Sequence, residues 1–222
     1  MSNTRQPPGK GDLHAEREDY QKHQLNRKDL HDNPVELFGR WLQQARDSNI
    51  IDATAMTLAT CTSQGLPSAR IVLLKQYTEE GFCWYTNYES RKGSELSANS
   101  NAALLFYWRE LERQVRIEGK VEKVAVEQSD AYFKSRPEGS RYNAAASPQS
   151  QVVPDQTWLA QRTEQLQQQY SIDSLERPGN WGGYRLLPRE FEFWQGRPSR
   201  LHDRFRYQRT DNQNWQIDRL AP

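Results

Sequence analysis

The stretch AMTLATCTSQGLPSARIVLLKQYTEEGFCWYTN, residues 55 to 87, holds three apolar runs of strand length separated by two short turns. Gaps of this length that contain glycine or proline are typical of β-hairpins. The stretch therefore predicts three antiparallel strands. The strands are expected at 55–62, 69–77 and 82–87, with turns at 64–67 and 78–81.

Strand-like runs continue along the chain beyond residue 100. Further strands are expected at 103–108, 113–124, 183–188, 190–196, 200–209 and 214–220. Helical segments at roughly 126–135 and 155–170 interrupt the series, and the second is polar enough to lie on the surface. Many short antiparallel strands with few helices favour a closed β-barrel.

An amphipathic helix precedes the first strand. Apolar residues recur at helical spacing after Pro34, which suits the first helical position, and Asn33 can cap the helix. By contrast, residues 1–20 carry scattered charges and little to bury. We therefore expect a flexible tail there and a single domain from 21 to 222. The apolar positions of the helix are Val35, Phe38, Trp41, Leu42 and Ala45.

Composition excludes several classes of function. With 30 basic and 29 acidic residues among 222, the formal net charge is only +1, which argues against a general binder of nucleic acid or membranes. No apolar run approaches the ~20 residues that a membrane-spanning helix needs, and the N-terminus does not resemble a signal peptide. We therefore expect a cytoplasmic protein in which any anion site is local.

Neither metal binding nor a disulfide is indicated. Cys61 and Cys83 lie inside apolar runs without metal-ligand spacing, so we expect two buried thiols. Three of the four histidines lie in the polar N-terminal region, which leaves His202 alone in the rest of the chain.

Positive charge is concentrated instead in RLHDRFRYQR, residues 200 to 209. Two interpretations of this segment stay open: a solvated face of an edge strand, or a wall of hydrogen-bond donors that faces an anion. Read as a strand, it places Arg200, His202, Arg204 and Arg206 on one side and Leu201, Phe205 and Tyr207 on the other, with only Asp203 breaking the alternation.

A second basic cluster lies at an expected helix start. Ser90 is placed to cap a helix whose first turn carries Arg91 and Lys92. Cations in a first turn oppose the helix dipole unless an anion lies among them. The alternative is two solvated side chains. Arg70 and Lys75 flank an expected core strand, and a charge at either end of such a strand can reach the rim of the barrel.

A third cluster has residues spaced by four. Tyr132 and Arg136 belong to the end of an expected helix, and Ser140 to the loop after Pro137. A guanidinium between two hydroxyls is a donor set suited to phosphate. Each cluster by itself is a weak signal.

Nine segments carry a resemblance through their order and spacing. They are RIVLLK (70–75), YTN (85–87), SRK (90–92), ERQVRIEGK (112–120), YFKSRP (132–137), PQS (148–150), EFWQG (192–196), RLHDRF (200–205) and the terminal IDRLAP. From about residue 20 onward the chain resembles the pyridoxine (pyridoxamine) 5'-phosphate oxidases. The resemblance implies an FMN-binding split β-barrel with helices and a homodimer with FMN at the interface. It also implies oxidation of pyridoxine or pyridoxamine 5'-phosphate to pyridoxal 5'-phosphate by O2, giving H2O2 and, from the amine, ammonia.

The resemblance further implies roles for individual residues, and no metal. Arg200 and His202 would be catalytic groups over the pyridine ring of the substrate, and the flavin phosphate would be the anion at Ser90. FMN contacts carried over by position are Arg70, Ile71, Val72, Leu73, Leu74, Lys75, Tyr85, Thr86, Ser90, Arg91, Lys92, Gln114, Gln149, Ser150, Trp194 and Arg204. Substrate contacts are Arg17, Tyr20, Lys75, Tyr132, Arg136, Ser140, Arg200 and His202.

The sequence departs from the family pattern at two places. YNAAA at 142–146 replaces a Gly-Ala-Trp segment, and KHQL at 22–25 replaces a glycine-containing stretch. Two other functions stay open: an FMN oxidase of another heterocycle, as in phenazine biosynthesis, and a non-catalytic module that binds FMN or pyridoxal phosphate. Relatives of the phenazine type tend to lose the substrate-phosphate set, which is complete here.

Overall fold

The computed structural model describes residues 19–222, so most of the expected tail at 1–20, including Arg17, lies outside the described residues. Within them, the strands form one antiparallel sheet. The strands are β1 (Ala55–Cys61), β2 (Pro67–Leu73), β3 (Gln76–Thr78), β4 (Gly81–Asn87), β5 (Asn101–Trp108), β6 (Arg113–Lys123), β7 (Trp181–Gln195), β8 (Asp203–Arg209) and β9 (Trp215–Leu220).

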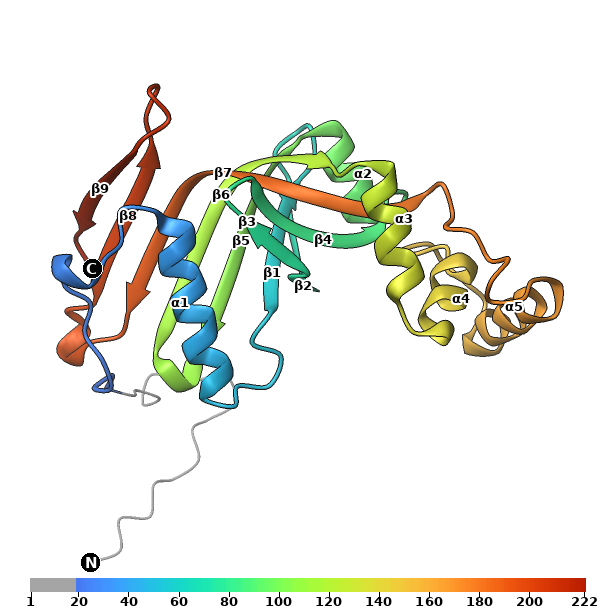
Figure 1. Ribbon diagram of the computed structural model, residues 1–222, viewed down its shortest axis with the longest axis horizontal. Helices are drawn as coiled ribbons and strands as arrows, with labels where there is room; N and C mark the ends of the chain where they lie inside the picture. Colours follow the sequence, from blue (N-terminus) through green and yellow to red (C-terminus); the bar gives the residue numbers. More distant parts are fainter. Residues whose placement is uncertain (1–18) are drawn as a thin grey trace, which may run out of the picture.

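The sheet curls into half of a barrel (Figure 1). Its strand order is β2-β1-β5-β6-β7-β4-β3, and β8 extends it beside β7 and is followed by β9. The order ends at β2 on one side and at β3 on the other, but these two strands follow each other in the chain. Between them the backbone N of Leu74 donates to the carbonyl oxygen of Thr54 and that of Lys75 to the carbonyl oxygen of Cys83, each at 2.9 Å. The architecture is that of the expected split β-barrel. A bulge between Glu118 and Gly119 lets β6 bend along β7.

Helix α1 fills the inside of the half-barrel. The Phe38 ring is fully buried and lies 5.0 Å from the ring of Phe82 and 4.9 Å from that of Phe106, measured between centroids. The side chain of Asn33 accepts from the backbone N of Val35, which confirms the expected cap and the buried face. The helices are α1 (Pro34–Asp47), α2 (Arg91–Ala98), α3 (Val126–Ser135), α4 (Glu138–Ala146) and α5 (Gln156–Gln169).

Helices α3, α4 and α5 form a separate layer at the end of the molecule opposite to β8 and β9 (Figure 1). A small second core joins this layer to the sheet and contains Phe133, Tyr142, Leu175 and Trp181. Helix α4 was not expected, and Ser140 therefore lies in a helix rather than in a loop. Its nine residues lack the apolar periodicity that marks a helix in a sequence.

Three expectations about strand boundaries are also wrong. The expected strands at 183–188 and 190–196 are one strand, β7, and the expected strand at 69–77 divides into β2 and β3. The segment 200–209 becomes a strand only at Asp203, because a 3-10 turn occupies Pro198–Arg200.

Asp203 does not interrupt the pattern of β8. Its carboxylate accepts from the backbone N of Leu25 at 3.0 Å and pairs with Arg219 at 3.0 Å, so this residue faces inward with Phe205 and Tyr207. Leu201, expected on the same face, precedes the strand and is 70% exposed. A hydrogen-bonded carboxylate therefore replaces an apolar side chain in a regular alternation.

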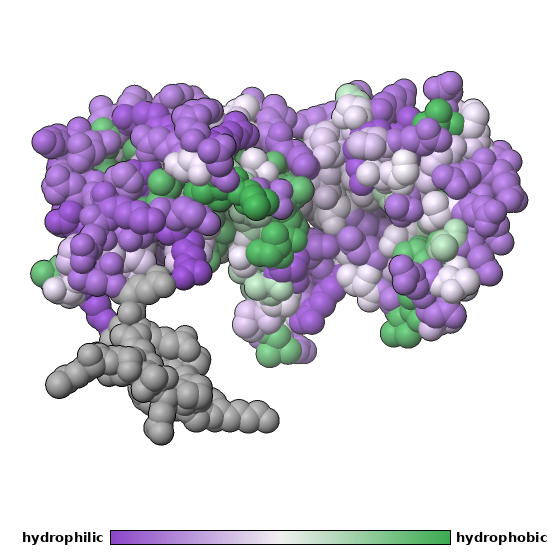
Figure 2. Space-filling view, turned by 90° about the horizontal axis from the view of Figure 1, so that it is seen from below, coloured by the Kyte–Doolittle hydropathy of each residue, from purple (hydrophilic) through white to green (hydrophobic). Residues whose placement is uncertain are grey.

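The outward face of the sheet changes from apolar to charged across its width. Ile71 of β2 is 65% exposed. It is opposite Thr57 of β1, which is in turn opposite Leu105 of β5. The same row across the sheet continues to Arg116 of β6 and Glu192 of β7. Figure 2 shows apolar residues gathered near the middle of the molecule, between a strongly polar end and the helical end. Exposed apolar surface of this kind is typical of a protein interface.

Both cysteines are free thiols, as expected, although only Cys83 is fully buried. Among residues 19–222 no helix is both long and apolar enough to span a membrane. The same residues contain no cluster of three or more side chains arranged to hold a metal ion.

Candidate functional site

The first part of the site is the N-terminus of α2. Ser90 caps this helix by accepting from the backbone N of Gly93 at 3.3 Å, as the sequence predicted. A Cβ atom on Gly93 would lie 2.0 Å from the carbonyl oxygen of Tyr88, so the close approach of the preceding turn requires glycine.

Lys92 turns back from this first turn into the protein. Its Nζ lies 3.1 Å from Oγ1 of Thr86, 3.3 Å from Oγ of Ser90 and 3.0 Å from Oε1 of Gln149. Burial, with a smaller contribution from Arg70, lowers the pKa of Lys92 to about 8. All three oxygen partners are uncharged, so this cation is suited to an added anion.

Sequence analysis missed Glu95, which organises the neighbouring arginines. Its carboxylate accepts from Ser68 at 2.6 Å and Thr60, and it pairs with Arg70 at 3.2 Å and Arg91 at 2.9 Å. Burial alone would raise the pKa of Glu95, but these hydrogen bonds outweigh it and lower the pKa to about 2. The spacing of four between Arg91 and Glu95 was the available sequence signal.

The second part of the site is an aromatic stack at the start of the helical layer. The rings of Tyr85 and Tyr132 are parallel with centroids 3.7 Å apart, and the Trp181 ring is nearly parallel to both. The guanidinium of Arg136 lies 4.7 Å above the Trp181 ring. The stack thus holds Arg136 flat against an apolar surface.

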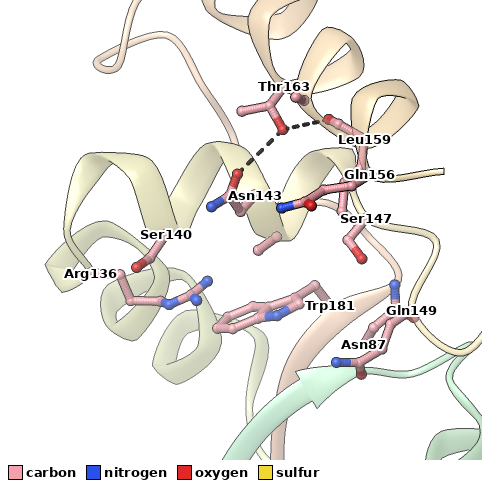
Figure 3. Close-up of a pocket in the computed structure, with 12 residues that line it drawn as sticks. Asn87, Arg136, Ser140, Asn143, Ser147, Gln149, Gln156, Leu159, Thr163 and Trp181 are labelled. Carbon is pink, nitrogen blue, oxygen red and sulfur yellow. Dashed lines mark hydrogen bonds between the residues drawn. The ribbon is translucent and has the colours of Figure 1, made fainter.

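Arg136 and Ser140 border a cavity of about 710 Å³ (Figure 3). Burial lowers the pKa of Arg136, and its NH1 group is buried and has no hydrogen-bond partner among residues 19–222. A buried donor on a cation is costly unless an anion accepts from it. The cavity is lined by Asn87, Arg136, Ser140, Asn143, Ala144, Ser147, Gln149, Gln156, Leu159, Ala160, Thr163 and Trp181.

Gln149 connects the first two parts of the site, because it binds Lys92 and also lines the cavity. Ser150, beside it, has a left-handed backbone with φ of 73°. Lys75 lies between β2 and β3, and the adjacent Gln76 accepts from Gln128 of α3 at 3.0 Å. The exposed Lys75 is therefore at the rim next to α3.

The third part of the site is a row across three strands. Gln114 of β6 is directly opposite Trp194 of β7, which is opposite Arg204 of β8. Arg204 is held by Glu192, whose Oε1 accepts from Nε at 2.8 Å. Glu192 is 2% exposed and also pairs with Arg116 at 2.9 Å, and sequence analysis had assigned it no role.

His202 packs beside this row. Its ring centroid lies 4.7 Å from that of Trp194 and 5.8 Å from that of Tyr20. The backbone N of Arg197 donates to Nδ1 at 3.1 Å, and burial together with Arg200 lowers the pKa of His202. The ring is therefore neutral near pH 7 and carries its proton on Nε2, which donates to no group among residues 19–222.

Arg200 is not part of the strand that the sequence predicted. It ends the 3-10 turn with φ of 61°, after Ser199 with φ of 56°. Asp19 fixes this turn by accepting from the backbone N of Ser199 at 3.0 Å. Arg200 and His202 thus precede β8, whereas Arg204 and Arg206 alternate along it.

One chain does not bring all of the expected residues together. The phosphate-type clusters at α2 and α4 lie toward one end of the molecule, and β8, which carries Arg204, lies at the other (Figure 1). A ligand that contacts both sets needs a second copy of the chain.

Comparisons with known proteins cover most of the chain. A family model described as pyridoxamine 5'-phosphate oxidase matches residues 42–170, and one described as pyridoxine 5'-phosphate oxidase C-terminal dimerisation region matches 181–222. A pyridoxine/pyridoxamine 5'-phosphate oxidase from Paraburkholderia phytofirmans is 54% identical over 207 residues, which cover 93% of this chain and 97% of the relative.

Two solved structures share the fold. The crystal structure of PhzG from Burkholderia lata 383, in complex with tetrahydrophenazine-1-carboxylic acid, is 33% identical with a TM-score of 0.82, over 88% of this chain and 95% of that chain. A pyridoxamine 5'-phosphate oxidase-related, FMN-binding protein from Nostoc punctiforme is 17% identical with a TM-score of 0.69, over 87% of this chain and 100% of that chain.

Proposed function

Because the chain belongs to the pyridoxine/pyridoxamine 5'-phosphate oxidase family, we propose that it oxidises pyridoxine and pyridoxamine 5'-phosphates to pyridoxal 5'-phosphate with FMN and O2. The observation that carries the substrate assignment is the guanidinium of Arg136, whose buried NH1 group has no partner in the described part of the chain, in a cavity that it shares with Ser140. A phosphate monoester supplies the missing acceptors.

The residues around Lys92 fit a flavin phosphate. A buried ammonium group with only neutral partners, at a helix N-terminus with free backbone N–H groups, favours a dianion. We propose that Lys92 and Arg91 bind this phosphate, with Arg70 behind them. Flavin, when bound, supplies a two-electron acceptor that O2 reoxidises.

The remaining flavin contacts in this proposal come from both copies of the chain. One copy contributes Ile71, Val72 and Leu73 of β2 with Leu74, Lys75, Tyr85, Thr86, Ser90, Gln149 and Ser150, and its partner contributes Gln114, Trp194 and Arg204. The exposed apolar face of β2 and the match of 181–222 to a dimerisation region support a homodimer.

The substrate phosphate acts at a distance from the reacting carbon. Its binding by Arg136, Ser140, Tyr132 and Lys75 holds the pyridine ring in register, so binding energy is used to position the substrate. The rigid stack of Trp181 under Arg136 keeps this anchor in place.

Arg200 and His202 act on the ring itself. The Nε2 proton of a neutral His202 can donate to the ring hydroxyl oxygen of the substrate, and Arg200 adds a cation beside the ring. Tyr20 packs against His202 and Trp194, which orients the histidine. In this arrangement the protein contributes position and charge rather than a covalent step.

An anaerobic visible spectrum tests the proposal. The purified protein, reconstituted with FMN, should lose its flavin absorbance on addition of pyridoxine 5'-phosphate, and air should restore it with release of pyridoxal 5'-phosphate. Unphosphorylated pyridoxine is the control and should react far more slowly.

The second candidate is an oxidase of a reduced phenazine, which the likeness to PhzG favours. Bleaching by a tetrahydrophenazine carboxylate but not by pyridoxine 5'-phosphate would establish this alternative. Absence of bleaching by either compound, with FMN bound, would support a non-catalytic flavin protein.

A further inference from the structure

Asn143 lines the same cavity as Arg136 and Ser140. It lies on α4 three residues after Ser140, and residues at this spacing share one face of a helix. Figure 3 shows the Asn143 side chain between Ser140 and Gln156, above the guanidinium of Arg136. It belongs to the YNAAA segment, in which the sequence departs from the family pattern.

Asn143 contacts α5 through Thr163. The single proton of the Thr163 hydroxyl is shared between Oδ1 of Asn143, at 3.3 Å, and the carbonyl oxygen of Leu159, one turn earlier in α5, at 3.0 Å. Because the amide oxygen faces Thr163, the amide nitrogen faces the cavity on the side of Ser140 and Arg136 (Figure 3). No hydrogen bond within residues 19–222 engages that nitrogen.

The lining of the cavity indicates which ligand this nitrogen meets. Arg136 is its one charged residue, the others are amides, hydroxyls and apolar groups, and no carboxylate borders it among the residues described. A phosphate monoester has three terminal oxygens with several lone pairs each. These can accept from a further donor in addition to the four residues proposed above to bind the phosphate.

We propose that Asn143 donates from Nδ2 to the phosphate of the substrate and so strengthens the selection of phosphorylated over unphosphorylated ligands. Thr163 is a positioning residue that turns the amide toward the phosphate. The inference rests on the proposed function, because it takes the ligand of Arg136 and Ser140 to be the substrate phosphate.

Equilibrium binding without turnover tests the inference. Pyridoxal 5'-phosphate and pyridoxal are titrated into the FMN-saturated protein, and wild type is compared with Asn143→Ala and Asn143→Asp. Loss of a hydrogen bond to a charged group should weaken binding of the phosphorylated ligand roughly tenfold in Asn143→Ala. The new carboxylate of Asn143→Asp should weaken it further by repulsion. Pyridoxal affinity and FMN affinity should stay within about twofold of wild type.

Thr163 variants separate positioning from a merely structural role. Thr163→Val keeps the shape but removes the hydroxyl, and it should weaken binding of the phosphorylated ligand by a smaller factor than Asn143→Ala. Thr163→Ser keeps the hydroxyl and should restore wild-type affinity. Gln161→Ala, at an exposed position of α5 that does not line the cavity, is the matched control.

The possible results are distinct. Equal weakening of both ligands, or no weakening of either in Asn143→Ala and Asn143→Asp, would overturn the role of Asn143 while leaving the proposed function intact. If wild type bound pyridoxal 5'-phosphate no better than pyridoxal, the proposed function would fail, and the role of Asn143 with it.

Discussion

The ammonium group of Lys92 donates to Oε1 of Gln149 at 3.0 Å, which ties the first turn of α2 to the loop after α4. The two residues are 57 positions apart in the sequence, and Gln149 also borders the cavity. This contact therefore joins the proposed flavin-phosphate site to the proposed substrate site through a single side chain.

The lowered pKa of Lys92 predicts a pH dependence of stability in the flavin-free protein. Between its folded pKa of about 8 and the ordinary value of 10.5, the unfolded chain binds more protons than the folded one, so Lys92 makes stability rise with pH. Relative to Lys92→Met, wild type should gain about 3 kcal/mol over this range. Urea unfolding of both proteins from pH 7 to 10.5 measures the difference, and a constant difference would contradict the prediction.

Glu95 predicts a second pH dependence of the same sign, in acid. Its pKa falls from 4.5 to about 2 on folding, so its contribution to stability is complete above pH 4.5 and is lost as the pH falls toward 2. Glu95→Gln should cost roughly 3 kcal/mol of unfolding free energy at pH 7 and progressively less in acid. Glu164→Gln, at an exposed position of α5, is the control and should change stability by less than about 0.5 kcal/mol. Parallel pH curves for wild type and Glu95→Gln would show that the carboxylate has no such role.

Most of the fold could be predicted from the sequence because its signals are local. The cap at Asn33, the apolar period of α1 and the hairpin turns after β1 and β3 each depend on a few neighbouring residues. Helix α4 could not be predicted, because it is stabilised by the packing of Tyr142 in the second core and not by an apolar periodicity in its own sequence.

In the candidate site, too, features with a local sequence signal could be predicted and features that depend on distant residues could not. The cap at Ser90 is visible in a short motif. Glu95 has one local partner, Arg91, but its contact with Ser68 and both ion pairs of Glu192 depend on other strands of the sheet. Asp203 shows most clearly what the sequence could not predict. Its carboxylate can lie on the buried side of β8 because it accepts from the backbone N of Leu25, which is 178 residues earlier.

The exposed apolar face of β2 predicts that association depends on Ile71. Ile71→Glu places a charge on this face and should convert a dimer into monomers that bind FMN poorly, since a buried unpaired carboxylate is strongly unfavourable at an interface. Ile51→Glu is the matched control, because Ile51 is 90% exposed in the turn after α1 and outside the sheet. Sedimentation equilibrium measures both variants, and a dimeric Ile71→Glu would contradict the prediction.

The arginines before and along β8 should have separable effects. Arg204→Ala should weaken FMN binding by roughly 1.5–3 kcal/mol, because it removes a charged donor that Glu192 holds beside Trp194. Arg206 lies two residues further along the same face, where Asp218 accepts from it at 2.8 Å, and Arg206→Ala should change FMN affinity by less than about 0.5 kcal/mol. Flavin fluorescence titration of the two variants measures the difference.

Arg200→Ala should give a third outcome, because this residue lies in the turn before the strand. FMN should stay bound, while kcat/KM for pyridoxine 5'-phosphate should fall by on the order of 100-fold, since the variant lacks a cation that holds the pyridine ring in position. Steady-state kinetics on flavin-saturated protein separates this loss from that of Arg204→Ala, which excess FMN should partly restore. If all three variants had the same mild effect on both ligands, the segment 200–209 would be a solvated face and its arginines would not belong to the site.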